Sequence, residues 1–280
     1  MAISTCPNDT FAFDRILRGD VCLPRPAGAE PWSIELLDIQ QLNDGFREGR
    51  FDVAKVSFAA AGRMDRPPMI LDAGSAIGFG VGPLMLGPPA GVTPRSPVTL
   101  CPGADTTATA LLSMFHPDAD VRHVVFSDIM PALARGDAAA GVCIHEGRFT
   151  YADHGLTLID DLGQRWHDET DSPLPLGGIA ARGDLPPSLA ADISGAIASS
   201  VRRATADPES ALPTMRRHAR EMNDDVLNEH VRLYVNDQTI SLGEIGRTAL
   251  EEFWRRLGRD APPRIVGTAG GPVGVAEDQT

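Results

Sequence analysis

Short apolar segments alternate with amphipathic segments along most of the chain, a pattern typical of α/β proteins. The predicted strands are short apolar runs at 33–38, 52–57, 82–86, 98–101, 121–126, 138–144, 156–162 and 176–181. The predicted helices carry apolar residues at helical spacing over 11–17, 39–46, 106–115 and 129–135. A long helical region runs from 187 to about 257, with breaks near Pro208 and around Asn236. The hydrophobic pattern therefore predicts an α/β fold.

The Pro- and Gly-rich segment 87–94 predicts a crossing between two lobes, since such clusters interrupt regular structure. A chain of 280 residues is long enough to form two lobes of moderate size. We expect a larger, discontinuous lobe of residues 1–92 and 180–262 and a smaller lobe of residues 93–179. The small, Gly-rich residues of 263–280 predict a mobile tail.

The chain is acidic, with a formal net charge of −13. Nucleic acids and anionic membranes bind clustered lysine and arginine, so we expect neither as a partner. We expect instead a small anionic substrate held in a cleft that supplies local positive potential. Lys55 is the only lysine of the chain. The sequence does not predict an oligomeric state.

The N-terminal residues 1–6 have neither a basic segment nor a long apolar one, so we expect no secretory signal and a cytoplasmic location. The four cysteines are widely scattered, which favours free thiols over disulfides or a metal site.

Several common catalytic motifs are absent or incomplete. The glycines at 78, 80 and 82 precede Pro83 and a predicted strand, whereas a dinucleotide-binding loop precedes a helix. His145 and Glu146 begin a zinc-protease motif, but Phe149 stands where its second histidine belongs. Neither a phosphate-binding loop nor a GxSxG nucleophile motif is present. Kinase, hydrolase and metalloprotease functions therefore have little support.

Several unusual strings occur in a characteristic order, among them CPNDTF at 6–11, KVSF at 55–58, IHEGRFTY at 144–151 and HVRLYVN at 230–236. Their order and spacing resemble the 1,4-dihydroxy-6-naphthoate synthase family of the futalosine route to menaquinone. The resemblance extends over nearly the whole chain. It implies a two-lobed fold of the periplasmic-binding-protein type 2, with a mixed sheet in each lobe and the active site in the cleft between them.

The resemblance also implies an activity. The family are lyases that convert cyclic dehypoxanthine futalosine into 1,4-dihydroxy-6-naphthoate and a sugar-derived fragment, without a metal or another cofactor. Two alternatives share the fold. A solute-binding protein would bind an anion and release it unchanged, and the sister enzyme of the pathway would dehydrate chorismate.

His145 follows a predicted strand, and ligands bind at the carboxyl ends of strands in open α/β sheets. A histidine there is either a general base or a structural residue with backbone partners. The resemblance implies the base, because the family's proposed base matches His145. Glu146 either orients the imidazole or is an ordinary surface carboxylate. Arg148 and Tyr151 either border the cleft or support the loop.

Thr106, Thr107 and Ala108 open a predicted helix after a Pro-Gly turn. Free amides and the helix dipole at such an end favour an anion, here the substrate carboxylate. Simple N-capping by threonine is the alternative.

Lys55 and Ser57 alternate with Val56 on a predicted strand, so they should share one face of it. Lys55 lines the cleft or is a solvated edge lysine, and Asn8 and Asp9 cap a helix or contact the ligand. Cys6 is expected to be a packed thiol. The predicted site combines a catalytic His145 with the following substrate-binding residues: Asn8, Asp9, Lys55, Val56, Ser57, Thr106, Thr107 and Ala108.

Overall fold

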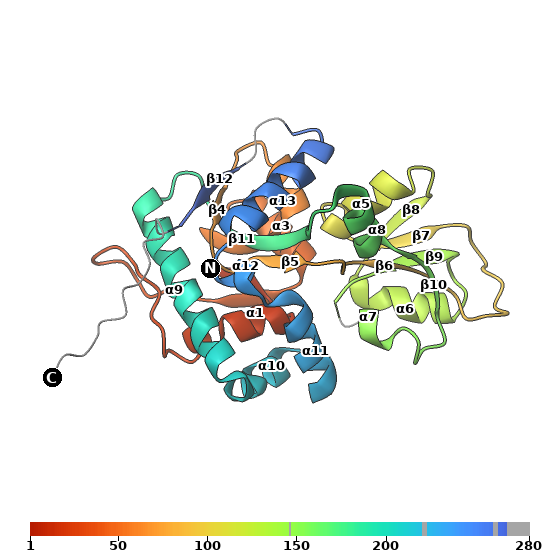
Figure 1. Ribbon diagram of the computed structural model, residues 1–280, viewed down its shortest axis with the longest axis horizontal. Helices are drawn as coiled ribbons and strands as arrows, with labels where there is room; N and C mark the ends of the chain where they lie inside the picture. The colour runs from red at the N-terminus through yellow and green to blue at the C-terminus, as the bar shows by residue number, and fades with distance from the viewer. Residues whose placement is uncertain (146, 220–222, 260–262, 268–280) are drawn as a thin grey trace.

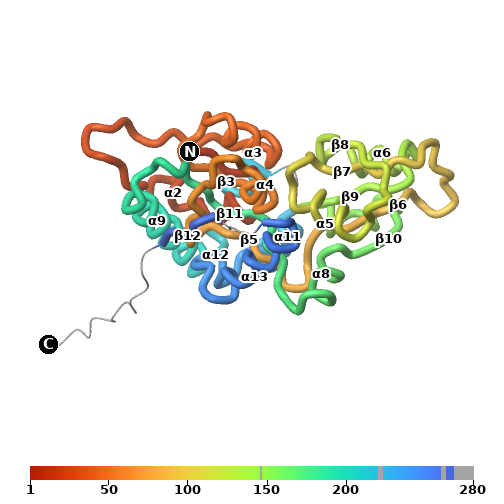
Figure 2. The backbone as a smooth tube through the Cα atoms, turned by 90° about the horizontal axis from the view of Figure 1, so that it is seen from above, coloured from red at the N-terminus to blue at the C-terminus, as the bar shows by residue number. Residues whose placement is uncertain are grey.

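The computed structural model describes residues 1–145, 147–219, 223–259 and 263–267. Two lobes lie side by side along the long axis of the molecule, each built around its own sheet (Figures 1 and 2). The predicted α/β class, with a mixed sheet in each lobe, is confirmed.

The larger sheet has the strand order β12-β4-β11-β3-β1-β2, and β5 pairs with β11. Its strands are β1 (Ala2–Ser4), β2 (Glu35–Leu37), β3 (Val53–Ser57), β4 (Met69–Leu71), β5 (Ala76–Gly78), β11 (Leu174–Ala181) and β12 (Arg264–Val266). β1 is parallel to β2 and β3, whereas β11 is antiparallel to β3, β4 and β5. The parallel strands β1 and β3 therefore end at the same edge of the sheet.

The smaller sheet has the order β10-β6-β9-β7-β8. Its strands are β6 (Leu84–Gly87), β7 (Thr99–Pro102), β8 (Val121–Val124), β9 (Ala140–Cys143) and β10 (Thr157–Asp161). β7 is parallel to β8 and β9, and β6 is antiparallel to β9 and β10.

Helices surround both sheets (Figure 1). They are α1 (Pro7–Ala12), α2 (Asp14–Leu17), α3 (Ile39–Arg47), α4 (Phe58–Arg63), α5 (Thr107–Phe115), α6 (Phe126–Ala134), α7 (Gly147–Thr150), α8 (Leu162–Thr170), α9 (Pro187–Ala206), α10 (Leu212–His218), α11 (Asp224–Tyr234), α12 (Asp237–Ile240) and α13 (Gly243–Arg256), with a 3₁₀ turn at Pro208–Ala211. No helix in the described ranges is long and apolar enough to cross a membrane.

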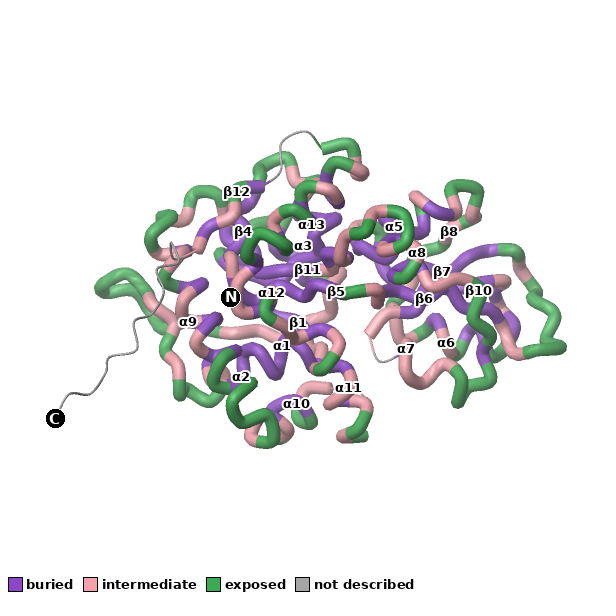
Figure 3. The backbone as a smooth tube through the Cα atoms, viewed as in Figure 1, coloured by how far each residue is buried: buried purple, intermediate pink, exposed green. Residues whose placement is uncertain are grey.

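One hydrophobic cluster continues from the larger lobe into the smaller one. It joins Phe58 and Trp254 of the larger lobe to Leu111 and Trp166 of α5 and α8, all fully or almost fully buried. A second cluster packs α9 against the other face of the larger sheet, and a third fills the smaller lobe. Buried residues accordingly follow the central strands of both sheets, such as β3, β7 and β9 (Figure 3).

The predicted lobe boundaries are wrong because two strands belong to the opposite lobe from the one predicted. β6, assigned to the larger lobe, pairs with β9 and β10 in the smaller sheet. Most of β11, assigned to the smaller lobe, pairs with β3 and β5 in the larger sheet. The chain therefore crosses between the lobes just before β6 and again just before β11, and segment 87–94 is a loop of the smaller lobe (Figure 1).

The predicted mobile tail is wrong over Arg264–Val266. These residues form β12, which pairs in parallel with β4 at the edge of the larger sheet. Residues 268–280 lie outside the described part of the chain.

Glycines allow close backbone contact at the first crossing. A Cβ atom on Gly163, in the first turn of α8, would lie 2.2 Å from the amide nitrogen of Gly82. Any side chain at residue 163 would therefore push α8 away from the crossing segment.

Candidate active site

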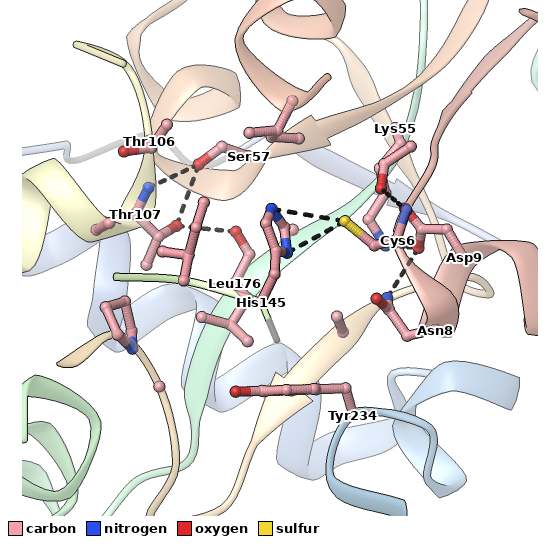
Figure 4. Close-up of a pocket in the computed structure, with 18 of the residues that line it drawn as sticks. Cys6, Asn8, Asp9, Lys55, Ser57, Thr106, Thr107, His145, Leu176 and Tyr234 are labelled. Carbon is pink, nitrogen blue, oxygen red and sulfur yellow. Dashed lines mark hydrogen bonds and ion pairs between the residues drawn. The ribbon is translucent and has the colours of Figure 1, made fainter. Parts of the chain in front are cut away.

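A cavity lies where the two lobes meet, and its walls come from both of them (Figure 4). The predicted site residues that line it are Asn8, Asp9, Lys55, Ser57, Thr106, Thr107, Ala108 and His145. Among the residues that the prediction omitted, Cys6, Leu176, His230 and Tyr234 line it too. Residues far apart in sequence are therefore brought together around one cavity.

Val56 is the exception among the predicted site residues. Its side chain is fully buried in the hydrophobic cluster of the larger lobe, and it is not part of the cavity wall. Successive side chains of a strand point to opposite faces, so Val56 must point away when Lys55 and Ser57 face the cavity. The side chain of Val56 therefore does not contribute to the cavity wall, and the predicted role of Val56 in substrate binding stays a prediction.

Lys55 is a buried, paired cation rather than a solvated lysine. Its Nζ atom donates to Asp9 Oδ1 at 2.7 Å and to the carbonyl oxygen of Gly74 at 3.0 Å. Lys55 and Asp9 are only 4% and 3% exposed. Because Asp9 neutralises Lys55 locally, an anionic ligand must obtain most of its stabilisation elsewhere in the cavity.

Asn8 and Asp9 lie inside α1, which begins at Pro7 with Cys6 as the N-cap residue, so the predicted capping by Asn8 and Asp9 is wrong. Asn8 Nδ2 donates to Asp9 Oδ1 at 3.0 Å. The other end of the same amide, Asn8 Oδ1, lies 3.0 Å from Nε2 of His230. Buried hydrogen bonds thus connect Lys55 to His230 through Asp9 and Asn8.

The start of α5 contacts the end of β3 directly in the cavity wall (Figure 4). Thr106 caps the helix by accepting a hydrogen bond from the Thr109 amide at 3.2 Å, so the capping interpretation is confirmed for Thr106. The amide of Thr107 donates to Ser57 Oγ at 2.9 Å, and the two side-chain hydroxyls are 3.1 Å apart. The Thr107 hydroxyl also donates to the carbonyl oxygen of Leu176 at 2.8 Å. Hydroxyl groups and helix-terminal amides therefore gather at this end of the cavity.

His145 leaves the sheet at the carboxyl end of β9, as predicted. Its φ of 57° is in the left-handed region, which costs a non-glycine residue about 1 kcal/mol. The imidazole packs edge-on against Phe126, with ring centroids 5.0 Å apart. A strained backbone that turns a titratable side chain into a cavity is typical of functional sites.

Cys6 is the neighbour of His145 that sequence reasoning missed. Its Sγ atom lies 3.1 Å from Nδ1 of His145, and the contact joins the two lobes (Figure 4). The prediction of a packed thiol considered only residues nearby in sequence, whereas His145 follows 139 residues later. The only sequence signal is that Cys6 opens the unusual CPNDTF string.

This contact predicts selective inactivation by a thiol reagent. Iodoacetamide should remove nearly all activity from a Cys22→Ser variant, because a carboxamidomethyl group on Cys6 would occupy the cavity beside His145. Burial raises the pKa of Cys101 to about 11 and that of Cys143 to about 12, so both thiols remain protonated and unreactive at neutral pH. A Cys6→Ser/Cys22→Ser variant is the matched control. Equal inactivation of both variants would show that iodoacetamide inactivates the protein by modifying a group other than Cys6.

Arg148 supports the loop that follows His145. Its guanidinium pairs with Asp161 at 2.6 Å and donates to the carbonyl oxygen of Gly82 at 2.9 Å. Tyr151 packs on the hydrophobic cluster of the smaller lobe. Glu146 lies outside the described residues. Within the described ranges, no three His, Cys, Asp or Glu side chains are grouped so as to hold a metal ion.

Two mixed-sheet lobes around a cavity define a protein of the periplasmic-binding-protein type of fold. Solved structures agree with this class. A Candida albicans protein with the generic periplasmic-binding-protein fold has a TM-score of 0.61 at 10% identity, covering 96% of this chain and 97% of that one. The alkanesulfonate-binding protein of Xanthomonas axonopodis pv. citri has a TM-score of 0.63 at 10% identity, covering 95% and 96%. At such identities the likeness shows the fold alone.

Sequence comparison is more specific. A family model described as menaquinone biosynthesis matches residues 1–259. The chain is 40% identical over 261 residues to the 1,4-dihydroxy-6-naphthoate synthase of Thermus thermophilus, covering 91% of this chain and 92% of that protein. It is 37% identical to the Streptomyces coelicolor protein of the same name, covering 91% of each. The chain belongs to the menaquinone biosynthesis family.

Proposed function

We propose that this protein is a carbon–carbon lyase that forms 1,4-dihydroxy-6-naphthoate from cyclic dehypoxanthine futalosine in the cytoplasm. The observation that carries the proposal is the cavity between the lobes, which is lined by both His145 and the Ser57–Thr107 pair. Two relatives that are named for this activity align with this chain over 92% and 91% of their own length.

The substrate carboxylate binds at the start of α5. There the Ser57 hydroxyl donates to the carboxylate, and the helix dipole adds favourable potential. The amide and the hydroxyl of Thr107 already donate to Ser57 Oγ and to the Leu176 carbonyl, so Thr107 positions the Ser57 hydroxyl. Because Lys55 is already paired with Asp9, this end of α5 is the better anion site of the cavity.

His145 acts as the general base. It removes a proton next to the ketone of the substrate, and the resulting enolate drives loss of the sugar-derived fragment and formation of the aromatic ring. The proposed reaction requires one positioned base and fixed hydrogen-bond donors. None of its steps uses a metal or another cofactor.

A product assay tests the proposal. Purified protein incubated with cyclic dehypoxanthine futalosine should release 1,4-dihydroxy-6-naphthoate, and an added chelator should not stop the reaction. A catalyst stabilises the transition state more than the substrate, whereas a binding protein returns its ligand unchanged. Recovery of intact substrate would assign the protein to the binding class, and dehydration of chorismate in a parallel incubation would assign it to the sister enzyme.

A further inference from the structure

His230 is a buried imidazole that the proposed mechanism does not use. It comes from α11, lines the same cavity as His145 and is only 2% exposed. Its ring centroid lies 4.8 Å from that of Tyr234 and 6.4 Å from that of His145. Two imidazoles from different lobes therefore contribute to one cavity wall.

The hydrogen bonds around Asn8 fix the tautomer of His230. Asp9 accepts from Lys55 and must also accept from the neighbouring Asn8, so the amide nitrogen of Asn8 faces Asp9. The amide oxygen of Asn8 then faces His230, and Nε2 of His230 has to donate to it. In the neutral imidazole the remaining nitrogen, Nδ1, therefore carries a lone pair and can only accept.

The accepting nitrogen has no partner among the described residues. Five buried side-chain nitrogen or oxygen atoms in the described part of the chain make no hydrogen bond, and Nδ1 of His230 is one of them. The other four belong to Asp14, Arg15, Gln40 and Ser75, none of which lines the cavity. Leaving a buried acceptor unsatisfied is costly, so an acceptor in a cavity wall indicates a donor on the molecule that the cavity binds.

The surroundings keep His230 neutral. Burial, with a smaller contribution from His145, lowers the pKa of His230 to about 3. Burial also raises the pKa of the neighbouring Tyr234 to about 12, so its phenol remains uncharged. The wall around Nδ1 thus suits a neutral donor better than an ammonium group or an anion.

We propose that Nδ1 of His230 accepts a hydrogen bond from an alcohol hydroxyl in the sugar-derived part of the substrate. The identity of this ligand rests on the proposed function, whereas the acceptor itself follows from the geometry of Asn8 and His230. The carboxylate end of the substrate binds at α5, and the hydroxyl-bearing end binds at α11. His230 is in this assignment a substrate-binding residue that holds the hydroxyl-bearing end of the substrate.

His230→Gln is the sharpest test. The glutamine amide can still donate to Asn8 Oδ1, but it places no acceptor at the position of Nδ1. A substrate hydroxyl left without its acceptor should raise KM about 5- to 100-fold, with kcat changed less than about threefold. The affinity for 1,4-dihydroxy-6-naphthoate, which lacks the sugar-derived part, should remain unchanged. His116→Gln is the matched control, because His116 pairs with Asp160 away from the cavity.

An NMR measurement tests the same contact without relying on turnover. In the His145→Asn variant, long-range ¹H–¹⁵N spectra should show His230 as the Nε2–H tautomer, and the Nδ1 signal should shift when the substrate is added. Equal weakening of substrate and product binding in His230→Gln, or an Nδ1 signal that does not respond to the substrate, would overturn the role of His230. A wild-type protein that releases no naphthoate would instead overturn the proposed function, and the spectra would still report whether the hydroxylated compound reaches Nδ1.

Discussion

Replacing His145 by asparagine should lower kcat about 100- to 10,000-fold while substrate still binds, because a positioned general base contributes about that much to a rate. Asparagine suits this position better than alanine, since residue 145 has a φ of 57° and asparagine tolerates the left-handed region well. The measurement is steady-state kcat together with the dissociation constant of the unconverted substrate from calorimetry.

His123→Asn is the matched control for His145→Asn. His123 is an exposed histidine on β8 of the same lobe and does not line the cavity, so the same chemical change should leave kcat unaltered. Loss of substrate binding in His145→Asn would indicate that His145 holds the substrate rather than deprotonates it. A variant that retains kcat within about tenfold of wild type would remove His145 from the role of base.

Much of the fold was predictable because its longer elements carry clear hydrophobic patterns. β3 and β7 and the helices α3, α5 and α9 lie close to the predicted ranges. Strands of three residues, such as β1, β4, β5 and β12, are too short to show a periodicity. β12 illustrates the limit, since its pairing with β4 depends on a sheet edge that local sequence does not reveal.

The lobe boundaries show a second limit of sequence reasoning. A Pro- and Gly-rich segment marks a break in regular structure, but it does not say whether the chain changes lobes there. β6 lies immediately before the segment 87–94 and belongs to the smaller sheet because it hydrogen-bonds to β9 and β10. The partners of a strand, rather than the composition of the following loop, decide its lobe.

A site residue was predictable where a polar or titratable side chain lies at the end of a predicted strand or at the start of a predicted helix. Ser57, Thr107 and His145 satisfy that condition and line the cavity. His230 does not, because it lies in the middle of α11, where the amphipathic pattern predicts only that this helix face is buried. Its partner Asn8 is 222 residues away in sequence. The string HVRLYVN at 230–236 was the one available signal.

Lys55→Met should destabilise the protein by about 3–5 kcal/mol, because it removes one partner of a buried ion pair and leaves the Asp9 carboxylate uncompensated. The free energy of unfolding from denaturant titration measures the effect. Arg182→Met is the control, since Arg182 pairs with Asp184 on the surface and its loss should have little effect.

The double variant Lys55→Met/Asp9→Asn distinguishes a buried charge from lost packing. Asparagine at residue 9 keeps an oxygen for the hydrogen bond from Asn8 but carries no charge, so the double variant should recover most of the stability lost in Lys55→Met. A double variant as unstable as Lys55→Met would show that the lysine acts through its packing and its bond to the Gly74 carbonyl. Recovery of stability without recovery of KM would show that the pair also positions Asn8 and, through it, the accepting face of His230.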